Sequence, residues 1–153
     1  MPLADALRVE RLLTLITDWA APRPDVVALA LVGSWARGAA RPNSDVDLVL
    51  LVTEPATYRH DETWPVQIPW ERVDSRLHSW QDKDYGALWS RHVLLEDGLE
   101  IEFGFAAPNW ASLNPLDDGT RRVIADGCRI LLDKSGLMAA LVSTSAAARR
   151  LTS

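Results

Sequence analysis

The sequence has 153 residues, of which 48% are hydrophobic and 24% charged, and its formal net charge at pH 7 is -5. This length and composition are ordinary for one globular domain with its own core, so we expect residues 1–153 to form a single domain. The negative charge argues against a surface that wraps a nucleic-acid backbone, because such a surface needs clustered Lys and Arg. A polyanionic substrate would need metal ions or hydrogen-bond donors to offset the repulsion.

The single cysteine, Cys128, excludes a disulfide within the chain and a metal site built from cysteines. The N-terminus lacks the basic region and apolar block of a signal peptide. No apolar stretch approaches the ~20 residues that cross a bilayer. We therefore expect a cytoplasmic protein that has no membrane partner.

The first part of the chain predicts a helix followed by two strands. Residues 5–20 carry apolar side chains at helical spacing and are followed by two prolines, which predicts a helix. Residues 26–32 (VVALALV) form a short apolar run that predicts a buried strand. A connection with a short helix, residues 33–44, leads to a second predicted strand at residues 46–52 (VDLVLLV).

The second part predicts a hairpin and then alternating elements. Residues 53–83 contain three prolines and three tryptophans and show no clear element. The segments 87–95 and 99–106 flank an Asp-Gly turn at residues 96–98, which is a hairpin signal. A helix, a strand and a helix are predicted after it, at residues 119–126, 128–132 and 137–149. The order indicates an α+β (α/β) fold, a mixed β-sheet with helices packed against it.

Two aspartates at the start of the second predicted strand are the main candidates for chemistry. Asp45 and Asp47 lie two residues apart, and alternate strand residues share a face, so both carboxylates point the same way. Two adjacent carboxylates repel each other unless a cation lies between them, and Mg²⁺ prefers a few carboxylates together with substrate phosphates.

A phosphate-binding turn is predicted directly after the first strand, in the connection that leads to these aspartates. Gly33 and Ser34 follow the first buried strand, where a glycine allows close approach of the backbone and the next N–H groups can donate to phosphate. The Ser34 hydroxyl adds a donor, and Arg37 lies one helical turn further on. A phosphate turn beside a carboxylate pair suits phosphoryl or nucleotidyl transfer.

The segment 33–50, with Gly33-Ser34, Arg37-Gly38 and Ser44-Asp45-Val46-Asp47-Leu48, resembles the signature of the DNA polymerase β-type nucleotidyltransferase superfamily. The most similar branches are the minimal nucleotidyltransferases, including antitoxin-type enzymes, and the small aminoglycoside or lincosamide nucleotidyltransferases. The order of predicted elements extends this resemblance to about Leu132. It implies a nucleotidyltransferase fold for this chain.

The resemblance also implies an activity, its cofactor and its residues. A nucleoside triphosphate such as ATP would bind with Mg²⁺ and be attacked at the α-phosphorus, with pyrophosphate leaving. Asp45 and Asp47 would hold the metal ions, and Ser34 would hold the terminal phosphates. The residues implied at the nucleotide are Gly33, Ser34, Arg37 and Ser44.

The resemblance implies a third carboxylate on a neighbouring strand, and the sequence offers two. Glu100 and Glu102 share one face of an alternating strand, and we favour Glu102 as the third metal ligand. Many members of the superfamily have Asp at this position, so Glu is a departure. In the alternative interpretation, both glutamates are solvent-facing residues of an amphipathic strand. His60, His78 and His92 show no paired metal-ligand spacing.

Two hypotheses of function follow. The first is an Mg²⁺-dependent enzyme that moves AMP from ATP onto a hydroxyl of a small molecule or of a protein, with a second copy or a partner chain completing the cleft. The second is a non-catalytic nucleotide-binding or antitoxin-type partner-binding module that keeps the fold. The aromatic residues among 53–110 would either pack in the core or wall an acceptor pocket.

Overall fold

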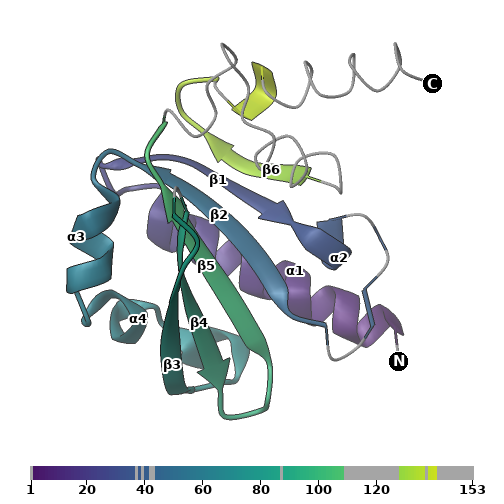
Figure 1. Ribbon diagram of the computed structural model, residues 1–153. Helices are drawn as coiled ribbons and strands as arrows, with labels where there is room; N and C mark the ends of the chain where they lie inside the picture. The colour runs from purple at the N-terminus through teal and green to yellow at the C-terminus, as the bar shows by residue number, and fades with distance from the viewer. Residues whose placement is uncertain are drawn as a thin grey trace.

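The computed structural model contains one chain, and the structure describes residues 2–36, 38, 40–41, 44–86, 88–108, 128–136 and 138–140. The elements in chain order are α1 (Pro2–Ala20), β1 (Val26–Val32), α2 (Gly33–Ala36), β2 (Val46–Val52), α3 (Pro55–His60), α4 (Trp64–Gln67), a 3₁₀ helix η1 (Trp70–Val73), β3 (Leu77–Asp84), β4 (Trp89–Leu95), β5 (Glu100–Ala106) and β6 (Cys128–Asp133). Figure 1 shows these elements along the chain.

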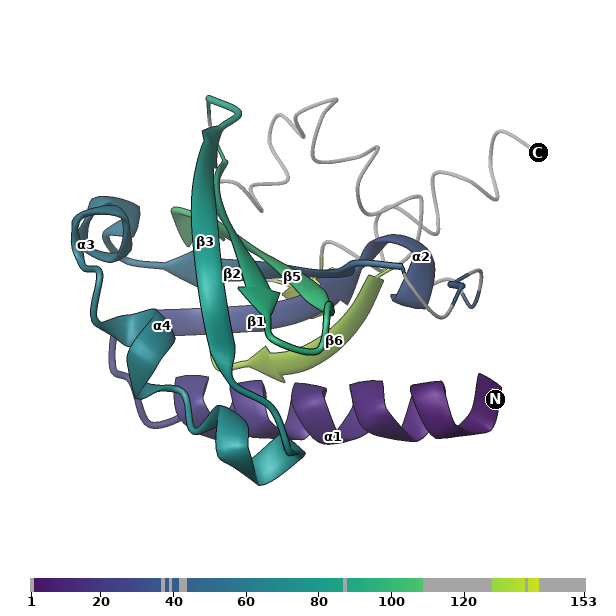
Figure 2. The same ribbon diagram turned by 90° about the horizontal axis from the view of Figure 1, so that it is seen from below.

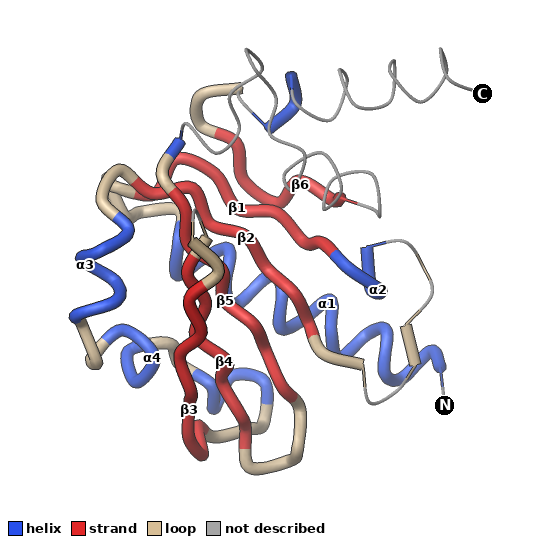
Figure 3. Tube along the Cα trace, viewed as in Figure 1, coloured by secondary structure: helices blue, strands red, loops and turns tan. Residues whose placement is uncertain are grey.

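The described strands form one six-stranded sheet in the order β3-β4-β5-β2-β1-β6. β2 and β5 pair in parallel, whereas β1 with β2, β1 with β6, β3 with β4 and β4 with β5 pair antiparallel. The sheet is therefore mixed, as the sequence predicts. The parallel pair lies at its centre, and Figure 3 shows the helices arranged around it.

The two faces of the sheet have different surroundings. α1 runs along one face, and Figure 2 shows it on the opposite side from the turn of the β3–β4 hairpin. The main hydrophobic core forms on the α1 face from alternate strand residues, with Leu29, Leu48 and Phe103 among its members. A smaller apolar cluster, including Val49 and Ala106, occupies part of the opposite face. No helix among the described residues is long and apolar enough to cross a membrane.

The predicted helix 5–20 and the strands 26–32 and 46–52 are confirmed, and α1 begins earlier, at Pro2. The hairpin is confirmed by the antiparallel pairing of β4 with β5. The strand predicted at 128–132 is β6, which extends to Asp133. The predicted helix 119–126 lies outside the described residues. So does most of the predicted helix 137–149, of which residues 138–140 are described and are helical.

The segment without a sequence signal contains α3, α4, η1 and the strand β3. β3 is an edge strand whose residues are mostly exposed, so its sequence, LHSWQDKD, lacks the apolar alternation that marks a half-buried strand. The three tryptophans of this segment pack inward: Trp64 and Trp70 are buried, and Trp80 packs against the main core. For these three the packing interpretation is confirmed.

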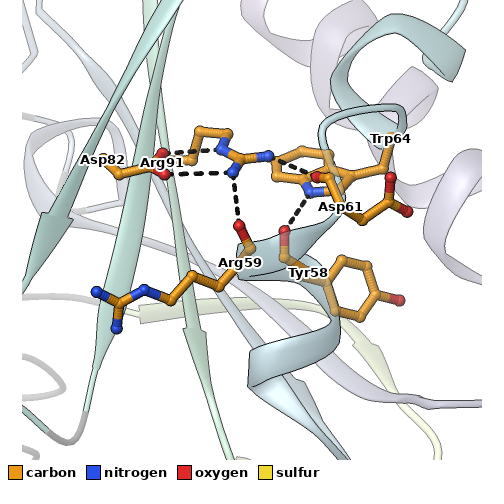
Figure 4. A network of polar contacts seen from close by, with 6 residues as sticks. All are labelled: Tyr58, Arg59, Asp61, Trp64, Asp82 and Arg91. Atoms are coloured by element: carbon orange, nitrogen blue, oxygen red, sulfur yellow. Dashed lines mark hydrogen bonds and ion pairs between the residues drawn. The ribbon is translucent and has the colours of Figure 1, made fainter.

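A buried arginine joins the β3–β4 hairpin to α3. Arg91 is 1% exposed, and its guanidinium donates to both carboxylate oxygens of Asp82, at 2.8 and 3.2 Å. It also donates to the backbone carbonyls of Asp61, at 2.8 Å, and Arg59, at 3.1 Å (Figure 4). The rings of three tryptophans surround it, with centroids 5.1 to 5.5 Å from Cζ: Trp64, Trp80 and Trp89. The planar fork of an arginine can satisfy all these acceptors together.

Replacing Arg91 with Lys should destabilise the fold, because one ammonium group cannot reach the carboxylate and both carbonyls at once. We expect the free energy of unfolding to fall by about 2–4 kcal/mol, as buried acceptors lose their donors. Urea unfolding of Arg91→Lys measures this loss. The matched control is Arg59→Lys, because the Arg59 side chain is exposed and pairs with Asp84; we expect a change within about 0.5 kcal/mol. Equal losses in the two variants would contradict this role of Arg91.

Candidate active site

The parallel pairing of β2 and β5 brings the predicted acidic residues onto one face. Asp47 is the register partner of Glu102 on β5 and of Val32 on β1, and Glu102 is in turn the partner of His92 on β4. Register partners in a sheet point to the same face, so the side chains form a row across four strands. This face is the one opposite α1, since Leu48 and Phe103, the next residues along β2 and β5, pack in the main core.

Gly33, at the end of β1, lies directly against the Asp47 carboxylate. A Cβ built on Gly33 would overlap Oδ2 of Asp47 and lie 3.3 Å from its Cγ. The backbone at Gly33 also has φ of +75°, which glycine adopts without steric cost. The turn after β1 therefore touches the first carboxylate of β2, the juxtaposition that the sequence predicts. Figure 1 shows α2 and the start of β2 at the same end of the sheet.

The second pair of carboxyls lies one step towards the start of both strands. Asp45 precedes Val46, whose register partner is Ile101, and the Asp45 and Glu100 side chains share a hydrogen bond. This hydrogen bond, followed by the negative charge of Asp45, raises the pKa of Glu100 above its ordinary value. A cation placed between the two carboxyls would offset their repulsion.

Glu102 has partners on the β3–β4 hairpin. Its Oε1 lies 3.1 Å from Nε2 of His92, and both side chains are 23% exposed. The distance fits an ion pair, but the orientation falls short of a hydrogen bond, and among the described residues Nε2 is buried without another hydrogen-bond partner. Tyr85, which follows β3, has a pKa raised first by burial, then by the charge of Glu102 and a hydrogen bond to it, and then by the charge of Asp47.

The turn between β1 and β2 is closed by its own hydrogen bonds. The Ser44 hydroxyl accepts from the backbone N–H of Arg41 at 2.8 Å, and the Ser44 carbonyl accepts from the indole of Trp35 at 3.1 Å. Trp35 also packs against the main core. Ser34 lies in α2, one residue after Gly33. Arg37 falls outside the described residues.

The donor set suits a hard divalent cation, although the side chains do not converge on one point. Asp45, Asp47, Glu100 and Glu102 all present carboxylate oxygens on the same face, and such oxygens are what Mg²⁺ prefers. Among the described residues, no three Asp, Glu, His or Cys side chains lie close enough together to hold a metal ion.

Two residues of this face were not predicted as site residues. His92 shows no metal-ligand spacing in the sequence, yet counting outward from the three-residue turn at residues 96–98 sets it opposite Glu102. Tyr85 had no sequence signal. Its approach to Glu102 depends on the twist of the β3–β4 hairpin, whose turn lies on the side of the sheet away from α1 (Figure 2).

The mixed six-stranded sheet with its helices is a nucleotidyltransferase-type fold. The model of the nucleotidyltransferase domain family matches residues 13–126, and the chain belongs to this family. No curated protein matches the chain.

Two solved structures resemble the chain in fold. An aminoglycoside 6-adenyltransferase from Bacillus subtilis is 15% identical with a TM-score of 0.45, and the match covers 65% of this chain and 35% of that one. A chain of the GLD-2/RNP-8 complex is 18% identical with a TM-score of 0.43, covering 78% of this chain and 45% of that one. The chain thus spans less than half the length of either.

Gly33→Ala should disturb the site beyond its effect on stability. The methyl group would displace the Asp47 carboxylate, and the positive φ adds strain of about 1–2 kcal/mol. The matched control is Gly136→Ala, because Gly136 has φ of +79° and open space around its Cβ position. We expect the two variants to lose similar amounts of free energy of unfolding, as measured by urea unfolding. Only Gly33→Ala should also lose binding of Mn²⁺ with a non-hydrolysable ATP analogue in calorimetric titration. Equal binding by the two variants would contradict the role of this contact.

The Asp45–Glu100 contact predicts a pH dependence of stability in metal-free protein. Because the folded pKa of Glu100 lies above its ordinary value of 4.5, its contribution is fully present below pH 4.5 and is lost as the pH rises through the raised value. Glu100→Gln should therefore gain stability relative to the native protein between pH 4 and 7. Asp45→Asn should give the same gain in stability. The double variant Asp45→Asn/Glu100→Gln should gain no more than either single variant. Thermal unfolding across this range measures the difference; a gain independent of pH would rule out the contact as its cause.

Proposed function

We propose that the protein is an Mg²⁺-dependent nucleotidyltransferase that moves AMP from ATP onto a hydroxyl group of a small molecule or of a protein. The observation that carries the proposal is the contact between Gly33, in the turn after β1, and the Asp47 carboxylate, which is in register with Glu102. A triphosphate seated on that turn would lie within reach of any cation that Asp47 holds. Membership of the nucleotidyltransferase domain family supports the same chemistry.

In the proposed reaction, the acceptor oxygen attacks the α-phosphorus of ATP and forms a new P–O bond. The bond from the α-phosphorus to the bridging oxygen breaks, and pyrophosphate leaves with its electron pair. Asp45 and Asp47 would hold Mg²⁺, which when bound supplies charge neutralisation at the phosphates. The Gly33-Ser34 turn would hold the terminal phosphates through backbone N–H groups and the Ser34 hydroxyl.

The acceptor proton needs a base on the same face. Glu102 is the favoured candidate, because it is in register with Asp47 and only 23% exposed. Glu100 is the alternative; it is exposed and shares its hydrogen bond with Asp45. A carboxylate that accepts a proton from the attacking hydroxyl must lie beside the acceptor. It must also not be hydrogen-bonded to a residue that holds the metal ion, such as Asp45. This geometry supports Glu102.

Asp47→Asn should abolish transfer with little loss of fold stability. Loss of a metal ligand removes several kcal/mol of transition-state stabilisation, a fall on the order of a thousandfold in rate. Stability should stay the same or rise slightly, because one carboxylate of a repelling set is neutralised. The assay is pyrophosphate release from ATP over a panel of candidate hydroxyl acceptors, with urea unfolding in parallel. Near-normal turnover in Asp47→Asn would show that the site is wrongly assigned.

The same assay separates the two glutamates and the two classes of function. Glu102→Gln should lower turnover strongly and Glu100→Gln mildly; equal and mild effects would mean that the third carboxylate lies elsewhere. Tight Mg²⁺-dependent binding of ATP with no turnover on any acceptor would favour a non-catalytic nucleotide-binding module. Exchange of Glu96, an exposed residue of the β4–β5 turn, for Gln is the matched control and should leave turnover unchanged.

A further inference from the structure

Glu102 is held from one side by groups that the proposed chemistry does not use. It lies between Asp47 on β2 and His92 on β4 in the register of the sheet. Its carboxylate approaches Nε2 of His92 at 3.1 Å, so Glu102 contacts the β3–β4 hairpin.

The His92 side of this contact is incomplete. Nε2 is buried, and within the described part of the chain it has no hydrogen-bond partner of proper geometry. A buried nitrogen without a hydrogen-bond partner is unfavourable. A modest rotation of the Glu102 carboxylate would complete the hydrogen bond, because the oxygen is already at hydrogen-bond distance. The imidazole therefore favours particular orientations of this glutamate.

A second group from the same hairpin reaches Glu102. The Tyr85 side chain is 55% exposed, and its pKa is raised first by burial and then by the charge of Glu102 and a hydrogen bond to it. The turn that carries Tyr85 is closed by its backbone N–H donating to the carbonyl of Leu88 at 2.8 Å. This turn lies on the side of the sheet opposite α1, which is the side of the acidic row (Figure 2).

The β3–β4 hairpin is itself anchored to the rest of the fold, so His92 and Tyr85 are carried on a rigid support. Arg91 neighbours His92 on β4 and points to the other face, where it binds Asp82 of β3 and the carbonyls beside α3. The polar network in Figure 4 thereby fixes both strands of the hairpin relative to the helices. A rigid support of this kind is what lets one side chain orient another.

We propose that His92 and Tyr85 are positioning residues that orient Glu102, so that the third carboxylate completes the site without rotational freedom. The inference rests on the proposed function, because it assigns these residues to the metal and acceptor side of that site. In this role His92 and Tyr85 would act through Glu102 and not on the nucleotide or the acceptor directly. Loss of such a supporting contact typically weakens metal affinity or activity about 10–100-fold.

The test is Mn²⁺ binding to the full chain with a non-hydrolysable ATP analogue, followed by electron paramagnetic resonance. His92→Asn should weaken the Mn²⁺ site that depends on Glu102 by about tenfold, while the Mn²⁺ bound with the triphosphate keeps its affinity. His92→Gln should retain the site, because the glutamine amide places a donor near the position of Nε2. Tyr85→Phe, at an exposed position that tolerates the change, should weaken the same site by about threefold.

Two further variants separate positioning from general damage. His78→Asn, on the exposed edge strand β3, is the matched control and should bind Mn²⁺ as the native chain does. The double variant His92→Asn/Glu102→Gln should bind no more weakly than Glu102→Gln alone, because His92 acts through Glu102.

The outcomes that overturn the inference are distinct from those that overturn the proposed function. Native affinity in both His92→Asn and Tyr85→Phe, or a His92→Asn effect that persists in full on top of Glu102→Gln, would overturn the positioning role alone. A native chain that binds no Mn²⁺ with the ATP analogue would overturn the proposed function and this inference with it. Should His92→Asn fail to fold, Tyr85→Phe gives the deciding measurement.

Discussion

The parallel pairing of β2 with β5 is the constraint on which the site depends. Its register sets Asp47 opposite Glu102 and places Asp45 beside Glu100, so four carboxyls share one face. Such crowding is unfavourable in a metal-free protein, as the raised pKa of Glu100 shows. The fold can hold these groups together because the other faces of the same strands, with Leu48 and Phe103, are locked in the main hydrophobic core.

The acidic face is thus strained electrostatically while the core face is tightly packed, and the two properties belong to alternate residues of the same strands. Gly33 adds a close contact at the edge of this face, since no larger residue would fit beside Asp47. Hydrophobic burial on one face of the sheet therefore offsets the repulsion between the carboxylates on the other face. Sites at which charge must be neutralised by a substrate or an ion commonly have this character.

The β3–β4 hairpin links the core and the acidic face in the same way. Within one strand, Arg91 points into a cage of tryptophans and His92 points to Glu102. The hairpin belongs physically to the scaffold, because Arg91 ties it to the backbone beside α3. It also belongs to the site, because its turn and its second strand reach the third carboxylate.

The sequence by itself determined the elements whose signal is local. Residues 26–32 and 46–52 are uniform apolar runs, the Asp97-Gly98 turn defines its hairpin, and the spacing of Asp45 and Asp47 fixes their common face. Only the tertiary structure decided which strands are neighbours, because β2 and β5 pair across some fifty residues of chain that carry no signal for that pairing. The edge strand β3 and the approach of Tyr85 to Glu102 were hidden for the same reason: both depend on long-range packing and sheet twist, which no short stretch of sequence encodes.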